Sequence, residues 1–334
     1  MSLSIRARAR ASFALAASLG LAIVVSACSG GGTASNLPAS SPVHQSRGVK
    51  MLGHLTISRV DAAKVARLVR RASAYGSPVR GGHIQHLRTM TSSAGNDLTN
   101  NGGPVMAGAN VYNILVNQTD ESTWGGQIAQ FENDLFGSGM INILDQYIGQ
   151  SATGAFSYAG DVQVTYDTSQ QLGDQDIYNI VYQVAKQYAT GYNNIYNVFL
   201  DSTVSQCSQS AGGCYGQQYC AYHGNTDYSD IGHTIYSVEP YQNIQGCQIS
   251  DTTGSPNGVL ADSTASTLSH EMFEAFTDPD VPNNVAWYNN SMGEIGDICA
   301  PANGITTGVV TLGSDSWEIQ PEYSNNVHDC SYSP

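Results

Sequence analysis

The segment STLSHEMFEAFTDPD, residues 266–280, holds the side chains best suited to chemistry in this sequence. His270 and Glu274 are four residues apart. On a helix they therefore lie about 40° apart around the axis and roughly 6 Å apart along it, so both can face one ion. Zinc peptidases use the related HExxH helix, in which two histidines hold the metal and the glutamate accepts a proton from water. Here Glu271 follows His270 and the last position is an acid, which gives HExxE; carboxylates also bind zinc, although less selectively.

A catalytic metal site needs a third protein ligand, and GEIGDIC at residues 293–299 offers two acids. Glu294 lies 20 positions after Glu274. This separation resembles the gluzincin peptidases, in which a downstream helix supplies a glutamate ligand and a nearby aspartate orients a metal-bound histidine. The resemblance implies that His270, Glu274 and Glu294 are the zinc ligands and that Glu271 is the general base. Asp297 would be the acid that orients a metal-bound histidine. Glu294 and Asp297 could exchange roles. The simpler alternative is that these acids only solvate a helix end.

Other catalytic groups have weaker signals. His223 in CAYHGN could bind substrate or stabilise a transition state at this site, although a histidine near a cysteine-rich turn is more often structural. The sequence contains no GxSxG motif for a serine nucleophile. Glu271 and Glu274 could imitate a glycosidase pair, but one helical turn is an unusual source for groups on opposite sides of a sugar.

The helix that carries HExxE is bounded by recognisable signals. Asp262 or Ser263 can cap its start. Asp278-Pro279 ends it, because the residue before a proline avoids the helical conformation. We therefore expect a helix over residues 263–276.

Strands and helices alternate from Val105 onward. The apolar patterns predict helices and strands in the following segments: helices 123–137 and 174–191; strands 110–116, 162–167, 194–200, 219–224 and 233–240; short extended pieces 308–312 and 316–324. This order favours an α/β (α+β) fold with a layered mixed sheet and flanking helices, of which a zincin-like arrangement is one form.

The amino-terminus has the pattern of an export signal. Three arginines precede an apolar run over residues 11–25, as in a signal peptide that would cover residues 1–27. The run ends in VSAC, which resembles the bacterial lipobox, and this resemblance implies a lipid on Cys28. A plain secretory signal is the alternative. Both readings place the protein outside the cytoplasm, either as a cell-envelope lipoprotein or as an extracellular protein.

Charge divides the chain. Residues 1–90 contain 12 Lys or Arg and one acid, whereas residues 91–334 contain 26 Asp or Glu and one base, Lys186. The acidic part should not bind nucleic acid, whose phosphates need Lys and Arg. Its self-repulsion should stay small at low pH, where its carboxylates are protonated. An acidic surface that serves only to keep the protein soluble would explain the same composition.

The basic part holds one segment with helical spacing, DAAKVARLVRRASAYG at residues 61–76. The pattern predicts an amphipathic helix, of which residues 61–74 could rest on anionic lipid near the anchor. A pro-segment that lies on the acidic domain and a solvated stalk are the alternatives. Residues 77–104 are rich in Gly, Ser, Asn and Thr and indicate a linker. We therefore expect a tethered region over residues 28–104 and a globular domain over residues 105–334.

Six cysteines remain when Cys28 is set aside: Cys207, Cys214, Cys220, Cys247, Cys299 and Cys330. An even number in an exported chain favours three disulfides, and no CxxC pair suggests that these cysteines bind metal. Their spacing leaves all pairings open. We expect Cys299 to bond to Cys330 and the other four to pair among themselves.

Five motifs carry a further resemblance: GGPVMAGANVYNILV, YCAYHG, PNGVLADSTASTLSHEMFEAFTDP, NNVAWY and GEIGDIC. Together they resemble the EXORDIUM or phosphate-induced protein family of plant cell walls, over about residues 102–330. The likeness implies an exported, disulfide-bonded protein linked to growth control and extracellular signalling, and it leaves the biochemical activity open. The first strand ends in VNQTDES, where the family pattern is rich in tryptophan, and the basic segment has no counterpart.

Two functional hypotheses follow. The first is a zinc-dependent peptidase or other hydrolase, with Glu271 as general base and a peptide or cell-wall substrate. The second is a non-catalytic surface module that binds cell-wall glycan or a protein partner, with a structural metal or none. In both, contact with the membrane is limited to the lipid anchor and the basic helix.

Overall fold

The computed structural model of the protein describes residues 49–78, 94–249, 254–303 and 305–334. All of them belong to one compact unit that begins at Gln45. The predicted signal peptide 1–27, the lipidation site Cys28 and the linker residues 79–93 lie outside the described residues.

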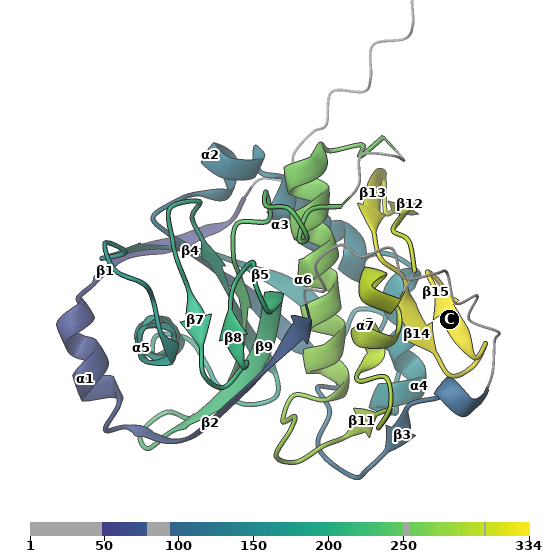
Figure 1. Ribbon diagram of the computed structural model, residues 1–334, viewed down its shortest axis with the longest axis horizontal. Coiled ribbons are helices and arrows are strands. Elements are labelled where there is room, and N and C mark those ends of the chain that lie inside the picture. The colour runs from purple at the N-terminus through teal and green to yellow at the C-terminus, as the bar shows by residue number, and fades with distance from the viewer. Residues whose placement is uncertain (1–48, 79–93, 250–253, 304) are drawn as a thin grey trace, which may run out of the picture. The chain divides into compact units, whose positions relative to one another are not determined.

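The centre of this unit is a mixed seven-stranded sheet, so the predicted α/β class is confirmed (Figure 1). The strands, from edge to edge, are β1 (Met51–Ile57), β5 (Phe156–Tyr166), β4 (Ala109–Val116), β6 (Asn194–Leu200), β10 (Gly232–Glu239), β9 (Tyr219–Tyr228) and β2 (Val69–Pro78). The first five run parallel. β9 is antiparallel to both of its neighbours.

Helices cover both faces of the sheet, as expected for parallel strands that are buried on both sides. On one face, α3 (Gln127–Phe136) and α6 (Val259–Thr277) share an apolar core with β6 and β10. On the other face, α5 (Asp174–Ala185) packs against β6 and α1 (Ala62–Val65) packs against α5. Every residue of β6 is buried between these two layers.

Most predicted elements are present with shifted ends. The helix expected over residues 123–137 is divided into α2 (Asp120–Trp124) and α3, because Gly125 and Gly126 have positive φ angles of 66° and 80°. The helix expected over residues 174–191 ends at Ala185. The extended piece 316–324 is two strands, β13 (Asp315–Ile319) and β14 (Glu322–Ser324).

The predicted helix 61–76 is wrong beyond its first turn, and this also removes the helix 61–74 expected to rest on lipid. α1 ends at Val65, and residues 69–78 form strand β2. The reason is tertiary: β9 would otherwise have an unpaired edge, and main-chain pairing with it outweighs the weak helical preference of the segment. β1 adds to the opposite edge, so the sheet includes residues from the segment assigned to a stalk or pro-segment.

A row of polar side chains crosses the sheet on the face covered by α3 and α6. Its members, which are consecutive backbone partners on β5, β4, β6, β10 and β9, are Asp161, Asn113, Asn197, Ser237 and His223. All are buried. Asn113 donates to Asp161 at 3.2 Å, and Ser237 donates to Asn197 at 3.0 Å. Glu132 of α3 accepts from both asparagines and so satisfies the centre of the row.

Smaller elements complete the unit. They are η1 (Arg59–Asp61), η2 (Ala94–Asn96), β3 (Thr99–Asn100), η3 (Met140–Leu144), α4 (Asp145–Ile148), β7 (Cys207–Ser208), β8 (Gly213–Cys214), β11 (Trp287–Tyr288), α7 (Ile295–Ile298), η4 (Pro301–Asn303), β12 (Gly308–Leu312) and β15 (Asp329–Ser331). α7 and β13 pack against α6, and β14 packs against α7.

Three disulfides join the six cysteines: Cys207–Cys214, Cys220–Cys247 and Cys299–Cys330. The predicted Cys299–Cys330 bond and the pairing of the other four among themselves are confirmed. Such bonds indicate an oxidising environment and therefore export. Among the described helices, none is both long and apolar enough for a membrane span.

Candidate metal centre

Helix α6 carries three of the predicted site residues on adjoining positions of its surface. It begins at Val259 after Gly258, four residues before the predicted start, and ends at Thr277, where the Asp278-Pro279 signal placed its end. Neither Asp262 nor Ser263 is the N-cap. His270, Glu271 and Glu274 are all buried, because β9 and β10 pack on one side of the helix and α7 and β13 on the other.

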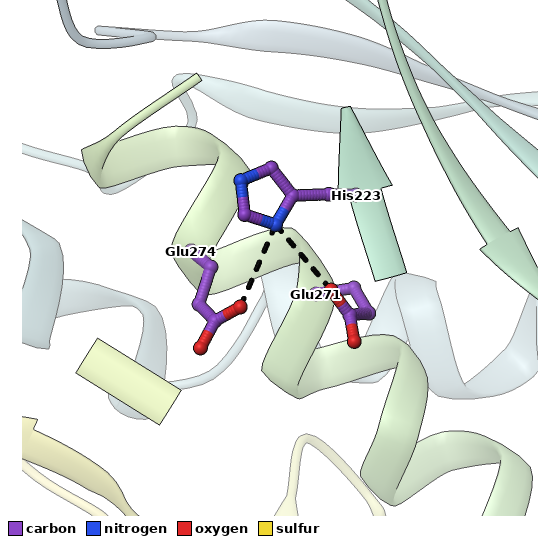
Figure 2. Close-up of side chains that lie close together, drawn as sticks. All are labelled: His223, Glu271 and Glu274. Atoms are coloured by element: carbon purple, nitrogen blue, oxygen red, sulfur yellow. Dashed lines mark hydrogen bonds and ion pairs between the residues drawn. The ribbon is translucent and has the colours of Figure 1, made fainter. Parts of the chain in front are cut away.

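Glu274 lies between two histidines and belongs to two groups of possible metal ligands. Its Oε1 is 2.9 Å from Nε2 of His270, and Oδ1 of Asp297 is 3.9 Å from the same nitrogen. Its Oε2 is 3.5 Å from Nδ1 of His223, which is also 3.4 Å from Oε2 of Glu271 (Figure 2). In each group the ligand atoms lie within 4.8 Å of one another, which is compatible with one bound ion per group.

The start of α7 brings the second motif to this helix. The backbone N–H of Asp297 donates to Oε1 of Glu274 at 3.1 Å. Gly296 allows this close approach, because a Cβ atom at this position would lie 2.6 Å from Nδ1 of His270. Asp297 therefore joins His270 and Glu274, whereas Glu294 lies beside His223, with Oε1 at 3.7 Å from Nε2. Of the two acids, Asp297 therefore lies where a third ligand beside His270 and Glu274 is expected, whereas Glu294 lies beside His223.

Two residues that no sequence motif indicated complete the surroundings of His270. The side-chain amide of Gln320 contacts Nδ1 at 2.8 Å and donates to the carbonyl of Gly296 at 3.1 Å, so it orients the ring. The hydroxyl of Ser77, at the end of β2, lies 2.5 Å from Nε2 of His270 and donates to Oε1 of Glu271 at 2.8 Å. Both contacts join segments far apart in the sequence, and no local pattern reveals them.

The centre is rich in carboxylates, and burial dominates their titration. Burial raises the pKa of Asp297 to about 8 and that of Asp278 to about 7. It also holds the pKa of Glu294 well above its usual range, and the same is true of Glu239 and Glu322 nearby.

The two histidines oppose this trend. Burial disfavours the charged form of both rings, but the surrounding acids outweigh it and raise the pKa of each well above its ordinary value, with Glu294 the main cause for His223 and Glu274 for His270. Burial likewise disfavours the carboxylate of Glu274, yet His270 and His223 lower its pKa to about 2. Glu274 is therefore ionised at neutral pH.

In the described part of the chain, no Lys or Arg forms an ion pair with these buried acids. Arg59 pairs with Asp176 and Lys64 pairs with Asp61, and both pairs lie outside the centre. Among the described residues, both carboxylate oxygens of Glu294 and of Glu322 lack a hydrogen-bond partner. Buried acids of this kind are expected to bind protons or a cation. The donor set, two imidazoles among carboxylates, fits a divalent metal ion.

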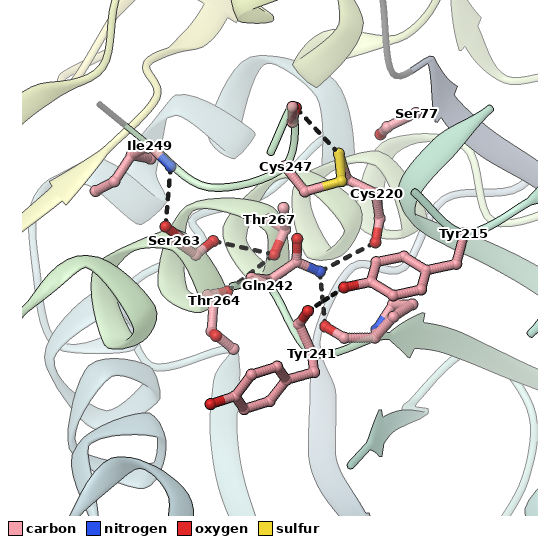
Figure 3. Close-up of a disulfide and its surroundings, with 12 residues drawn as sticks. Ser77, Tyr215, Cys220, Tyr241, Gln242, Cys247, Ile249, Ser263, Thr264 and Thr267 are labelled. Carbon is pink, nitrogen blue, oxygen red and sulfur yellow. Dashed lines mark hydrogen bonds between the residues drawn. A yellow bond between two sulfur atoms is a disulfide. The ribbon is translucent and has the colours of Figure 1, made fainter. Parts of the chain in front are cut away.

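The disulfide Cys220–Cys247 holds the loop beside the centre (Figure 3). Cys220 lies on β9, three residues before His223. The side chain of Gln242 donates to the carbonyl of Cys220 at 3.0 Å, and the backbone N–H of Ile249 donates to the hydroxyl of Ser263 on α6 at 2.9 Å. Strand and helix are thus connected through one loop, which keeps His223 in place opposite Glu271 and Glu274.

The structure therefore brings together all six residues named as catalytic groups or metal ligands in the sequence: His223, His270, Glu271, Glu274, Glu294 and Asp297. The chain matches no protein-family model, no curated protein and no solved structure. The resemblance to the EXORDIUM family accordingly depends on the sequence motifs alone.

Proposed function

We propose that this protein is an exported metal-dependent hydrolase, with zinc as the metal and a peptide or cell-wall polymer as the substrate. The observation that carries this proposal is the position of Glu271 beside two histidine–carboxylate groups, all buried in a centre where the described residues form no ion pair with Lys or Arg. His270, Glu274 and Asp297 would hold the ion. A bound zinc ion polarises a carbonyl group and lowers the pKa of water.

The chain's own residues supply the remaining chemistry. Oε1 of Glu271 and Nε2 of His270 both contact the hydroxyl of Ser77, so an oxygen can be held between this base and a ligand atom. Glu271 is therefore placed to take a proton from a water molecule at that position. His223 faces Glu271 and Glu274 from β9 and can hold a proton or donate a hydrogen bond there.

The burial of every ligand supports a second candidate, a non-catalytic surface module of the EXORDIUM kind with a closed structural metal. In this case the module would bind glycan or a protein partner through another surface. A lipid on Cys28 would attach either form to the cell envelope.

Two measurements on the full-length exported protein separate the candidates. The first is metal content by elemental analysis after purification without chelator, where about one zinc per chain supports both. The second is hydrolysis of unstructured protein and of cell-wall polymer by the wild type and by Glu271→Gln. Turnover that Glu271→Gln abolishes without loss of zinc supports the hydrolase. Zinc without any turnover supports the structural module, and absence of metal contradicts the metal centre itself.

A further inference from the structure

Strand β2 is paired with β9 in the way that an extended peptide binds to a sheet edge. It is the last strand of the sheet, and without it β9 would be the edge next to the metal centre. Pairing is antiparallel, with Ser73 opposite Asn225, Tyr75 opposite His223 and Gly76 opposite Tyr222. Addition of a strand through main-chain hydrogen bonds is a common mode of peptide recognition.

The end of β2 reaches the chemical groups of the centre. Figure 1 shows β2 running along β9 toward α6. The hydroxyl of Ser77 contacts both Nε2 of His270 and Oε1 of Glu271. It therefore occupies the place between the base and a metal ligand where a reacting group would have to lie.

β9 and its neighbours are shaped to receive this strand closely. A Cβ atom on Gly224 would lie 2.4 Å from the carbonyl oxygen of Ser73, so a larger residue at this position would push β2 away. The side chain of Asn225 donates to the hydroxyl of Ser73 at 2.7 Å. The hydroxyl groups of Tyr75 and Tyr288 are 3.0 Å apart, and their rings meet edge to face.

These contacts also define what the edge can accept. The side chains of Ser73 and Ala74 are buried, whereas Arg70 and Arg71 are exposed. The arginines approach a domain whose residues 91–334 contain 26 acids and one base. A segment with basic residues, then small ones, then an aromatic residue fits both the space and the charge.

We propose that the outer edge of β9 is the peptide-binding edge of the metal centre, and that β2 is an internal occupant that blocks it. The substrate class is then an extended peptide in the orientation of β2, and β2 slows hydrolysis by the wild type without abolishing it. This inference rests on the proposed function where it calls the bound peptide a substrate. Peptide binding to β9 can be measured without turnover.

The experiment uses the full-length protein with zinc and a fluorescent peptide of sequence VRRASAYGSP, residues 69–78. The variant Ala74→Pro with Tyr75→Pro removes ladder hydrogen bonds from β2. The matched control, His54→Pro with Leu55→Pro, does the same to β1 at the opposite edge. We expect the β2 variant to bind the peptide at least about tenfold more tightly than the wild type and the control, by fluorescence anisotropy.

A milder variant covers the case in which paired prolines prevent folding. Ser73→Ala with Ser77→Ala removes the side-chain contacts of β2 with Asn225, His270 and Glu271 and leaves β9 unchanged. It should bind the peptide several-fold more tightly than the wild type and, if the protein is a hydrolase, cleave peptides faster. Folded, zinc-loaded variants that bind the peptide no better than the control would overturn the inference. Tighter binding without turnover would support the inference and contradict the hydrolase.

Discussion

The hydroxyl of Ser77 lies 2.5 Å from Nε2 of His270, although 193 residues separate the two along the chain. The contact exists because β2 pairs with β9 and α6 packs across the same strand. It joins the amino-terminal basic segment to the HExxE helix and gives the metal centre an oxygen atom from outside its own motifs.

Replacement of Glu271 by Gln should abolish the proposed hydrolysis and preserve metal binding. The amide keeps the size of the side chain but cannot accept a proton, and loss of a general base typically lowers turnover about 10²–10⁴-fold. The measurement is kcat/KM with zinc content determined on the same sample. A Gln variant with wild-type turnover would show that Glu271 is not the base.

Replacement of His270 by Ala should remove the bound metal. The control is His233→Ala, because this half-buried histidine also contacts two acids, Asp227 at 2.6 Å and Asp280 at 2.9 Å, but belongs to neither ligand group. Elemental analysis should find about one zinc in the wild type and in the control, and none in His270→Ala. Equal zinc in all three proteins would place the metal elsewhere.

Removal of the metal with a chelator should lower the melting temperature of the wild type. A ligand that binds only the folded state stabilises it by about 2.7 kcal/mol at one hundred times its Kd. His270→Ala should melt at the same temperature with and without chelator. A wild type that is insensitive to chelator would argue against a bound metal of structural consequence.

Replacement of Gly296 by Ala should disturb the centre through its backbone. The new Cβ would lie 2.6 Å from Nδ1 of His270, so either the ring or α7 must move. We expect weaker zinc binding and a loss of roughly 1–3 kcal/mol in the free energy of unfolding, as is typical of overpacking. The control is Gly139→Ala, since Gly139 has φ of −70° and its added Cβ meets no atom within 4 Å. Similar losses in both variants would contradict the argument.

Asp161 should make the protein more stable at mildly acidic pH. Burial raises its pKa to about 7, whereas the pKa of an aspartate in the unfolded chain is about 4. Between these values the folded state holds a proton that the unfolded state has lost, so the free energy of unfolding falls as pH rises from 4 to 7.

The matched variant is Asp161→Asn, which resembles the protonated side chain at every pH. Relative to this variant, the free energy of unfolding of the wild type should fall by about 1.4 kcal/mol for each pH unit across that window. The whole change is then a few kcal/mol. Urea titrations at pH 4.5, 6 and 7.5 measure it. A constant difference between the two proteins would show that Asp161 does not titrate there.

Much of the central sheet and of the metal centre could be predicted, because the sequence patterns that indicate them are local. β6 is a short apolar run and was predicted with its observed bounds. The spacing of His270 and Glu274 depends only on helix geometry. The motif GEIGDIC indicated both of its acids, although their distances to His270 and His223 depend on how α7 packs against α6.

The amino-terminal segment could not be predicted because its structure depends on distant partners. Residues 61–76 have helical spacing, yet most of them lie in or lead to β2, whose partner β9 lies about 150 residues further along the chain. The contacts of Ser77 and Gln320 with His270 also have no counterpart in local sequence. Propensity is a weak preference that such long-range contacts override.

The polar row from Asp161 to His223 also fixes the alignment of five strands. Side chains alternate between the two faces, so a slip of one residue would turn a strand's polar member toward the opposite face. Asn197 would then lie among the apolar side chains of that layer, such as Val198 and Tyr196 in the present alignment, away from Glu132. A buried polar group without a partner costs about 1–3 kcal/mol. The same residues that lead to the metal centre therefore exclude misaligned sheets, so that His223 reaches α6 only when every strand before it is in register.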